Sequence, residues 1–118
     1  PASLTKIMTA LLVMQHLADS NNSDAEKWTV SVRAAAQPAS HLGLRVGLEI
    51  KPSTILDAIL VPSANDAAVV AAEAIARGEA AFAQRMNDMA ARLGLTRTRF
   101  ANASGLPARQ FTTARDIA

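Results

Sequence analysis

The stretch from Ser3 to Ala18 is apolar on nearly every side of the helix that its spacing predicts. Its large apolar side chains recur mostly three or four residues apart: Leu4, Ile7, Met8, Leu11, Leu12 and Met14. Ala10 and Val13 leave little of the remaining surface polar, and the polar run from Asp19 to Asn22 ends the pattern. A helix that is apolar nearly all round is a buried one, so we expect the rest of the chain to cover it.

The sequence contains few large aromatic side chains that could pack against this helix. Half of the 118 residues are hydrophobic, but only one is Trp, three are Phe and none is Tyr. Ala, Leu, Ile, Val and Met must therefore form the core, which suits closely packed helices. The length fits one domain at most, and a charged fraction of only 19% argues against disorder.

Charge, cysteine content and histidine spacing exclude several function classes. The formal net charge is only +2, and no basic run is interleaved with aromatic residues, so nucleic acid is not expected as a partner. There is no cysteine, which excludes disulfides and thiolate metal sites. His16 and His41 are the only histidines and stand far apart, so we expect both to be structural. We expect no metal and no other cofactor. The apolar stretch from Ile7 to Val13 is well short of the ~20 residues that a membrane span needs.

Two short strands are predicted between the helices. Trp28 to Val32 alternates in polarity and contains β-branched residues, and a second short strand is expected near Leu48 to Ile50. Between them, Pro38, Gly43 and Gly47 interrupt any regular pattern. We therefore expect that stretch to be irregular.

Further helices follow the second strand. Their expected ranges are Pro52 to just before Pro62, Asp66 to Arg77 and Ala80 to Leu93, with one more starting near Thr113 and Asp116. Thr54 and Asp57 have the spacing of a capping box, and Gly78 is the expected stop of the second of these helices. The helix from Ala80 has a predicted core face of Phe82, Met86, Met89 and Leu93.

Ser3 and Lys6 stand at the start of the first helix as a Ser-x-x-Lys pair. An i, i+3 spacing places Lys6 one turn above Ser3 on the same face of the helix. A serine hydroxyl needs a base to become a nucleophile, and a lysine can be that base if burial lowers its pKa. The positive end of the helix favours a developing alkoxide on Ser3. Taken alone, the pair fits equally well an N-cap and a solvated lysine.

Ser63 and Asn65 stand in the tight connection predicted between two later helices. Taken alone, such residues are typical helix caps. Beside an N-terminal Ser-x-x-Lys pair, they are better explained as a second motif, Ser63-Ala64-Asn65, of the same site. A short polar pair on a rigid turn is a sensible way to place catalytic groups.

A series of motifs along the whole chain carries a family resemblance. In order, they are PASLTKIMTA from residue 1, HLGLRVG from 41, LDAILV from 56, SANDAA from 63, NASGL from 102 and TTARD from 112. This order resembles the low-molecular-mass penicillin-binding proteins, the serine-type D-alanyl-D-alanine carboxypeptidases. Ser-x-x-Lys, Ser-Asp-Asn and Lys-Thr-Gly form the shared motif set of penicillin-binding proteins and class A β-lactamases. The second motif departs from the resemblance at its middle residue, where Ala64 stands and the family often has Gly.

The resemblance implies the fold. We expect a mainly α fragment of an α+β fold, namely the helical part of the penicillin-binding protein and β-lactamase-like transpeptidase fold. It would keep one or two short strands and lack most of the five-stranded sheet. Residues 1–118 would be a partial catalytic domain, truncated at both ends. No Lys-Thr-Gly is present, because Lys27 precedes Trp and Lys51 precedes Pro, so this chain alone is expected to turn over substrate poorly or not at all.

The resemblance also implies the reaction, which is hydrolysis of the terminal D-alanyl-D-alanine bond of peptidoglycan stem peptides in cell-wall synthesis or remodelling. Ser3 would form the acyl-enzyme with Lys6 as base, and Ser63 would relay a proton between Lys6 and the departing amine. Asn65 would bind the substrate's peptide group and fix the geometry of Lys6. β-lactam antibiotics would be covalent inhibitors. The protein would be periplasmic or otherwise extracytoplasmic, with any membrane anchor outside this chain.

Two other functions stay open. One is another Ser-x-x-Lys acyl transferase, such as a β-lactamase or a D-alanyl endopeptidase; the other is a non-catalytic helical module that binds the cell wall. A class A β-lactamase would have Ser-Asp-Asn and a deacylating Glu, but here Ala64 replaces the Asp, and Glu73 and Glu79 are predicted to be surface carboxylates.

Asn102-Ala103-Ser104 fits a glycosylation pattern but is predicted to be a structural turn.

Overall fold

The structure is a computed structural model that describes residues 2–20, 26–38, 42–95 and 97–105. Its elements are α1 (Ala2–Asp19), β1 (Trp28–Thr29), α2 (Val32–Ala35), β2 (Glu49–Ile50), α3 (Pro52–Leu60), α4 (Asn65–Ala76) and α5 (Glu79–Arg92). The two strands pair antiparallel, with Trp28 opposite Ile50 and Thr29 opposite Glu49. The predicted mainly helical class with two short strands is confirmed.

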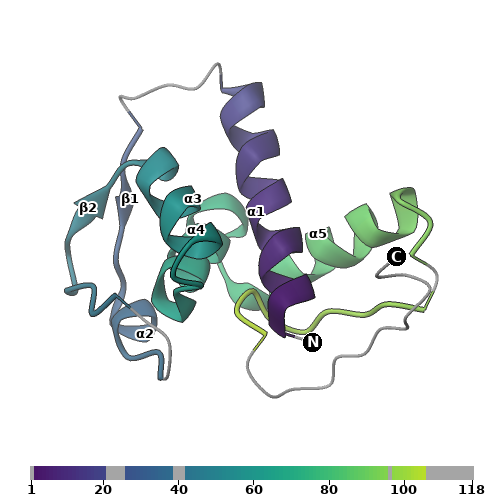
Figure 1. Cartoon of the computed structure of the whole chain (residues 1–118). Helices are drawn as coiled ribbons and strands as arrows, with labels where there is room; N and C mark the ends of the chain where they lie inside the picture. The colour runs from purple at the N-terminus through teal and green to yellow at the C-terminus, as the bar shows by residue number, and fades with distance from the viewer. Residues whose placement is uncertain (1, 21–25, 39–41, 96, 106–118) are drawn as a thin grey trace.

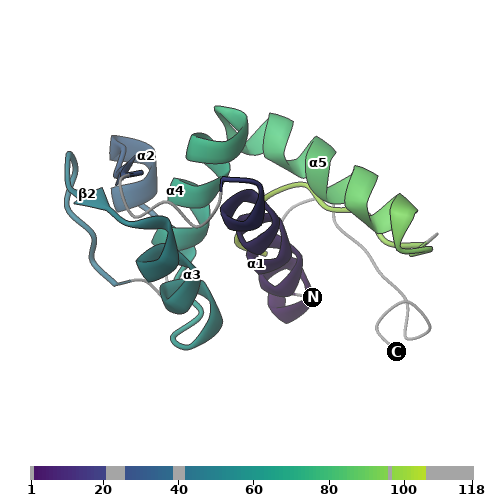
Figure 2. The same ribbon diagram turned by 90° about the horizontal axis from the view of Figure 1, so that it is seen from above.

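Helix α1 lies in the middle of the described part. Figure 1 shows it between the pair formed by α3 and α4 on one side and α5 on the other, and it packs against all three. The β1–β2 pair lies beyond α3 and α4, away from α1, and β1 packs on α4 (Figures 1 and 2). The central helix predicted from the apolar stretch is therefore present.

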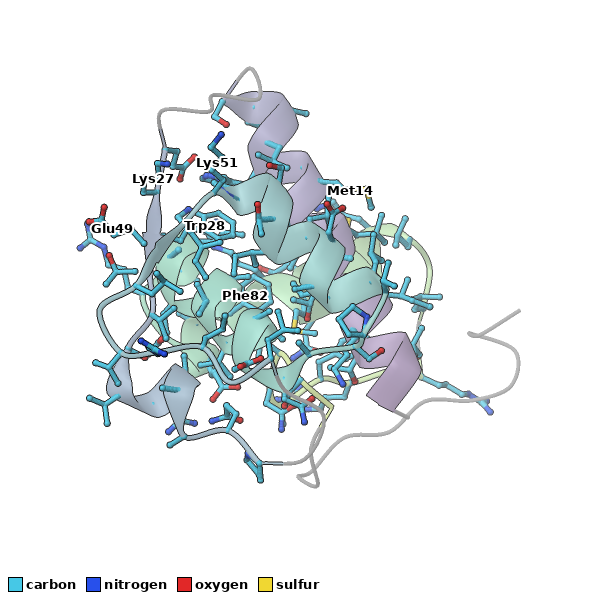
Figure 3. All side chains as sticks on the ribbon, turned by 60° about the vertical axis from the view of Figure 1, so that its left-hand side comes forward. Met14, Lys27, Trp28, Glu49, Lys51 and Phe82 are labelled. Atoms are coloured by element: carbon cyan, nitrogen blue, oxygen red, sulfur yellow. The ribbon has the colours of Figure 1, made fainter. Side chains whose placement is uncertain are left out.

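The burial of α1 is less complete than its apolar sequence predicts. Met8 and Val13 are buried, but Ile7, Leu11 and Met14 are 54%, 38% and 42% exposed. Figure 3 shows Met14 at the outer side of the helix. The prediction of burial all round is wrong for the described residues, because α3, α4 and α5 cover only part of the circumference of α1. No helix in the described ranges is both long and apolar enough to cross a bilayer.

Small side chains and a few large ones form the core. Every side chain of α4 from Asn65 to Ala72 is buried, and its alanines and valines let neighbouring helices approach closely. Phe82 and Met86 of α5 are fully buried, and Phe82 lies in the interior in Figure 3. Burial of one such side chain stabilises a fold by about 1.5–3 kcal/mol. The prediction that Leu93 belongs to the core face of α5 is wrong, because Leu93 is 55% exposed. Ala90 is buried instead.

The predicted strand from Trp28 to Val32 is too long, because β1 ends at Thr29 and Val32 already begins α2. The rest of α2 falls in the stretch that was predicted to be irregular. Ser31 is its N-cap, and the Ser31 hydroxyl accepts a hydrogen bond from the Ala34 N–H at 3.0 Å. The same hydroxyl donates to the carboxylate of Glu73 on α4. Glu73, predicted as a surface carboxylate, is thus half-buried and ties α2 to α4.

Two predicted helix-end signals are wrong in detail. Helix α3 begins with Pro52 at its first position after the N-cap Lys51, so Thr54 does not open a capping box. Helix α4 ends at Ala76, and Arg77 takes the left-handed conformation (φ 65°) one residue before the expected stop at Gly78. The predicted helix near Thr113 lies outside the described residues.

His16, which was predicted to be structural, has a structural partner. Its Nε2 lies 2.9 Å from the Glu26 carboxylate, and the indole N–H of Trp28 donates to the same carboxylate at 2.8 Å. This cluster ties the C-terminal part of α1 to the start of β1. His41 lies outside the described residues.

Glu79 is a second carboxylate that was predicted to be on the surface, and this prediction is wrong. Its side chain is only 9% exposed, and the Arg33 Nε donates to it at 2.9 Å. The ion pair ties α2 to the start of α5. The turn predicted at Asn102 is confirmed, because the Gly105 N–H donates to its Oδ1 at 2.8 Å.

The segment 97–105 returns along α5 and α1 and is held by two side chains. Asn87 of α5 accepts from the Phe100 N–H at 2.7 Å and donates to the Phe100 carbonyl at 3.0 Å. The fully buried Thr9 of α1 donates to the Ala103 carbonyl at 2.7 Å, with the Thr5 carbonyl also in reach at 3.1 Å. The helix at the centre of the fold therefore binds the end of the described chain directly.

We expect Thr9→Val to lower the free energy of unfolding by about 1–3 kcal/mol, because it keeps the shape of the side chain and leaves the buried Ala103 carbonyl without its donor. Thr9→Ser keeps the hydroxyl and is the matched control. Urea unfolding of the three proteins measures the difference. An equal loss in both variants would show that packing of the methyl group, and not the hydrogen bond, holds the segment.

Candidate active site

Lys6 lies on α1, one helical turn after Ser3. The backbone of Ser3 lies in the first turn of α1, where helix N–H groups have no intrahelical acceptor; its side-chain geometry is outside what the structure describes. Lys6 itself is only 9% exposed. Burial lowers the pKa of Lys6 from its ordinary value of 10.5, because desolvation disfavours the charged ammonium.

No carboxylate offsets the burial of Lys6 in the described residues. The ion pairs there join His16 to Glu26 and Arg33 to Glu79, and neither involves Lys6. An opposite charge would raise a lysine pKa and favour the protonated form. The burial of Lys6 thus makes its ammonium easier to deprotonate, and the neutral amine is the form that can accept a proton.

Ser63 lies in the connection between α3 and α4 with an unusual backbone. Its φ of 54° is in the left-handed region, which costs an L-residue other than Gly, Asn or Asp about 1–2 kcal/mol. The turn is closed by the Ala64 N–H, which donates to the Ala58 carbonyl of α3 at 3.0 Å. Local strain of this kind is concentrated at functional sites and turns. The predicted tight connection between two helices is confirmed.

Asn65 is the first residue of α4 and is 3% exposed. Its Nδ2 donates to the Pro38 carbonyl at 3.0 Å. Its Oδ1 is buried and has no hydrogen-bond partner among the described residues. A buried acceptor without a partner costs about 1–3 kcal/mol, so this oxygen is a ready acceptor for an N–H group.

Simple helix capping does not explain the Ser63-Ala64-Asn65 motif. The N-cap of α4 is Ala64, which has no side chain able to cap, and no side-chain hydrogen bond is formed at that position. The alternative that Ser63 and Asn65 are simple helix caps is therefore not supported at this helix start, and their catalytic roles stay predictions.

Asp66 is a buried residue of the same turn that the sequence interpretation treated only as a helix start. It is 0% exposed. Its carboxylate accepts from the N–H groups of Leu42 at 3.0 Å and Leu44 at 3.1 Å, and from the Ala67 N–H at 2.9 Å. An acidic residue in the first turn of a helix is favoured by the helix dipole and was visible in the sequence. The contacts to residues 42 and 44 are non-local, so the sequence pattern did not reveal them.

The packing of the helices relates the two motifs to each other. Helix α1, which carries Ser3 and Lys6, packs against α3 and α4, the two helices that flank the Ser63–Asn65 connection. The chemistry that such residues can perform is acyl transfer, with a serine nucleophile, a lysine whose pKa is lowered, and polar groups on a rigid turn.

The chain is similar in sequence to known proteins of one family. The family model of D-alanyl-D-alanine carboxypeptidases matches residues 1–118. The D-alanyl-D-alanine carboxypeptidase DacF of Bacillus subtilis is 41% identical over 106 residues, which cover 90% of this chain and 27% of DacF. DacC of Escherichia coli is 36% identical over 125 aligned residues, covering 100% of this chain and 31% of DacC. The chain thus spans 27–31% of the length of these curated relatives.

Solved structures show the same fold. The D-alanyl-D-alanine carboxypeptidase DacD from Francisella tularensis superposes with a TM-score of 0.94 at 37% identity, covering 100% of this chain and 29% of that one. Penicillin-binding protein D2 from Listeria monocytogenes, in an ampicillin-bound form, gives 0.80 at 31% identity, covering 99% and 48%. The predicted fold, the helical part of the penicillin-binding protein and β-lactamase-like fold, is confirmed. The chain belongs to the D-alanyl-D-alanine carboxypeptidase family, whose structural neighbours are the low-molecular-mass penicillin-binding proteins.

Proposed function

We propose that this chain is part of the catalytic domain of a serine-type D-alanyl-D-alanine carboxypeptidase that acts on peptidoglycan stem peptides outside the cytoplasm. The observation that carries the proposal is Lys6. It is buried one turn after Ser3, its pKa is lowered by burial, and it has no ion pair in the described part. Those are the properties that a base for Ser3 needs.

In the first chemical step, Ser3 Oγ attacks the carbonyl carbon of the penultimate D-alanine. Lys6 Nζ takes the hydroxyl proton, and the carbonyl oxygen becomes an oxyanion. The Ser3 N–H at the start of α1 is suited to donate to that oxyanion. When the tetrahedral intermediate collapses, the carbon–nitrogen bond breaks, and the proton passes from Lys6 through the Ser63 hydroxyl to the departing D-alanine amine.

In the second step, water attacks the Ser3 ester. Lys6, neutral again after giving up its proton, accepts a proton from the water as the new bond forms, and the ester bond to Ser3 Oγ breaks. The proton then returns to Ser3. The shortened stem peptide leaves as a free carboxylate, so the net reaction is hydrolysis and not cross-linking.

Asn65 is proposed to bind and orient. Its Nδ2 is engaged by the Pro38 carbonyl, whereas its Oδ1 is buried without a partner among the described residues. Oδ1 is therefore suited to accept an N–H from the substrate amide or from the Lys6 ammonium. Either contact would hold the reacting groups in the relative orientation that the reaction needs.

The third family motif does not occur in this sequence. Lys-Thr-Gly is absent, and in the resemblance stated above its strand supplies the second oxyanion donor and binds the substrate carboxylate. We therefore propose that residues 1–118 alone turn over substrate poorly or not at all. β-lactams are proposed as covalent ligands of the complete site, in keeping with the ampicillin-bound form of the related Listeria protein.

A D-alanyl-D-alanine endopeptidase is the second candidate. Relatives with that name from Pseudomonas aeruginosa and Escherichia coli are each 32% identical over 117 residues. The two activities share the nucleophile, so the preferred peptide, and not acylation, separates them. A class A β-lactamase is less well supported, because Glu73 and Glu79 are engaged by Ser31 and Arg33.

We expect incubation with benzylpenicillin to add one penicilloyl group to a protein that extends through the Lys-Thr-Gly strand, because Ser3 is the activated nucleophile. Intact-mass spectrometry measures the adduct. Ser3→Ala should abolish it, whereas Ser53→Ala, which changes an exposed serine on α3, should not. An adduct retained in Ser3→Ala, or its absence from the folded wild-type protein, would refute the proposal.

We expect Ser63→Gly to separate stability from activity. Glycine adopts the left-handed backbone of Ser63 without strain, so the free energy of unfolding should stay level or rise by up to about 1 kcal/mol. The acylation rate should fall by about 100-fold or more, because the proton relay is removed. Urea unfolding and stopped-flow acylation by a chromogenic β-lactam measure both. An acylation rate close to that of the wild type would exclude Ser63 as the relay.

A further inference from the structure

Asp66 and Asn65 are neighbours that both hold the connection between α2 and β2. Asn65 Nδ2 donates to the carbonyl of Pro38, on one side of that connection. The Asp66 carboxylate accepts from the N–H groups of Leu42 and Leu44, further along it. Two consecutive side chains at the start of α4 thus bind the same connection at separate points.

The Asp66 carboxylate is built into the fold and not solvated. It is 0% exposed, although a carboxylate is seldom fully buried unless its oxygens are satisfied. Oδ2 accepts from both Leu42 and Leu44, and Oδ1 accepts from Leu42 and from the Ala67 N–H of its own helix. One side chain therefore joins the first turn of α4 to a segment more than twenty residues earlier.

The orientation of the Asn65 amide depends on two described features. The amide has a single described hydrogen bond, from Nδ2 to the Pro38 carbonyl, and this contact leaves Oδ1 without a described partner. The backbone that carries the amide belongs to the first turn of α4, which the neighbouring Asp66 ties to Leu42 and Leu44. A side chain on a fixed backbone keeps its free oxygen in one orientation.

We propose that Asp66 is a positioning residue: by holding residues 42 and 44 against the start of α4, it fixes the orientation in which Asn65 presents Oδ1 to the reacting groups. Asp66 itself does not touch the substrate. This inference rests on the proposed function, because it assigns Asp66 to the acylation that Ser3 performs.

The test uses Asp66→Asn in the full-length protein, because asparagine has nearly the same shape but only one acceptor oxygen and so cannot hold all of the Leu42, Leu44 and Ala67 N–H groups. We expect the acylation rate with benzylpenicillin to fall about 10-fold or more. We also expect faster hydrogen exchange at the Leu42 and Leu44 amides, which reports the clamp without reference to activity.

The matched control is Ser31→Ala, which removes a different side-chain clamp on α4. Ser31 contacts Glu73, near the opposite end of that helix. The Ser31→Ala variant should lower the urea midpoint through loss of the α2 cap. It should leave unchanged both the acylation rate and the hydrogen exchange of the Leu42 and Leu44 amides. A general loss of stability would affect the two variants alike, whereas a positioning role affects only Asp66→Asn.

A double-mutant cycle then connects Asp66 to Asn65. In an Asn65→Ala background, Asp66→Asn should have little further effect on acylation, because the group that it orients is gone. Independent, multiplying effects of the two changes would overturn the inference, as would unchanged acylation in Asp66→Asn. Both results leave the proposed function intact if wild type forms the Ser3 adduct. A folded wild-type protein that forms no adduct would instead overturn the proposed function and this inference together.

Discussion

The burial of one ammonium group is the constraint on which the rest of the site depends. Lys6 lies on the helix that packs against α3, α4 and α5, and it has lost most of its contact with water. A buried charge is costly unless it is paired, and no carboxylate pairs with Lys6 in the described residues. The cost falls if the amine is neutral, so burial lowers the pKa of Lys6. The packing that stabilises the fold thereby gives Lys6 a property that its proposed role as a base requires.

The turn between α3 and α4 likewise combines local costs in stability with a proposed role in the site. Ser63 has a left-handed backbone, Asn65 has a buried oxygen without a described partner, and Ala64 stands where a capping side chain would stabilise the helix. Each feature costs stability locally, and the well-packed alanines and valines of α4 offset that cost. Strain and unmet polar groups that persist in this way are typical of functional sites. The Asp66 carboxylate keeps the turn and its neighbouring connection in one arrangement.

Much of the fold was predictable because its signals are local. Apolar spacing predicted α1, α3, α4 and α5 to within about one residue at each end, and the motif spacing predicted the family. Non-local packing decided the rest. Leu93 is apolar but lies at the end of α5 with nothing described to cover it, and Glu79 is buried because Arg33 reaches it from α2. For the site, the order of Ser3, Lys6, Ser63 and Asn65 was readable, and their roles stay predictions. The Asp66 clamp was not readable, since its partners are Leu42 and Leu44.

The most direct test is the pH dependence of the acylation rate of the full-length protein. If Lys6 is the base, the rate rises as Lys6 loses its proton, and because burial lowers its pKa the midpoint lies below 10.5. Lys6→Met should remove that rise and most of the rate, and Lys27→Met, at an exposed lysine, should keep both. A midpoint at or above 10.5, or the same rise in Lys6→Met, would contradict the assignment of Lys6 as the buried base.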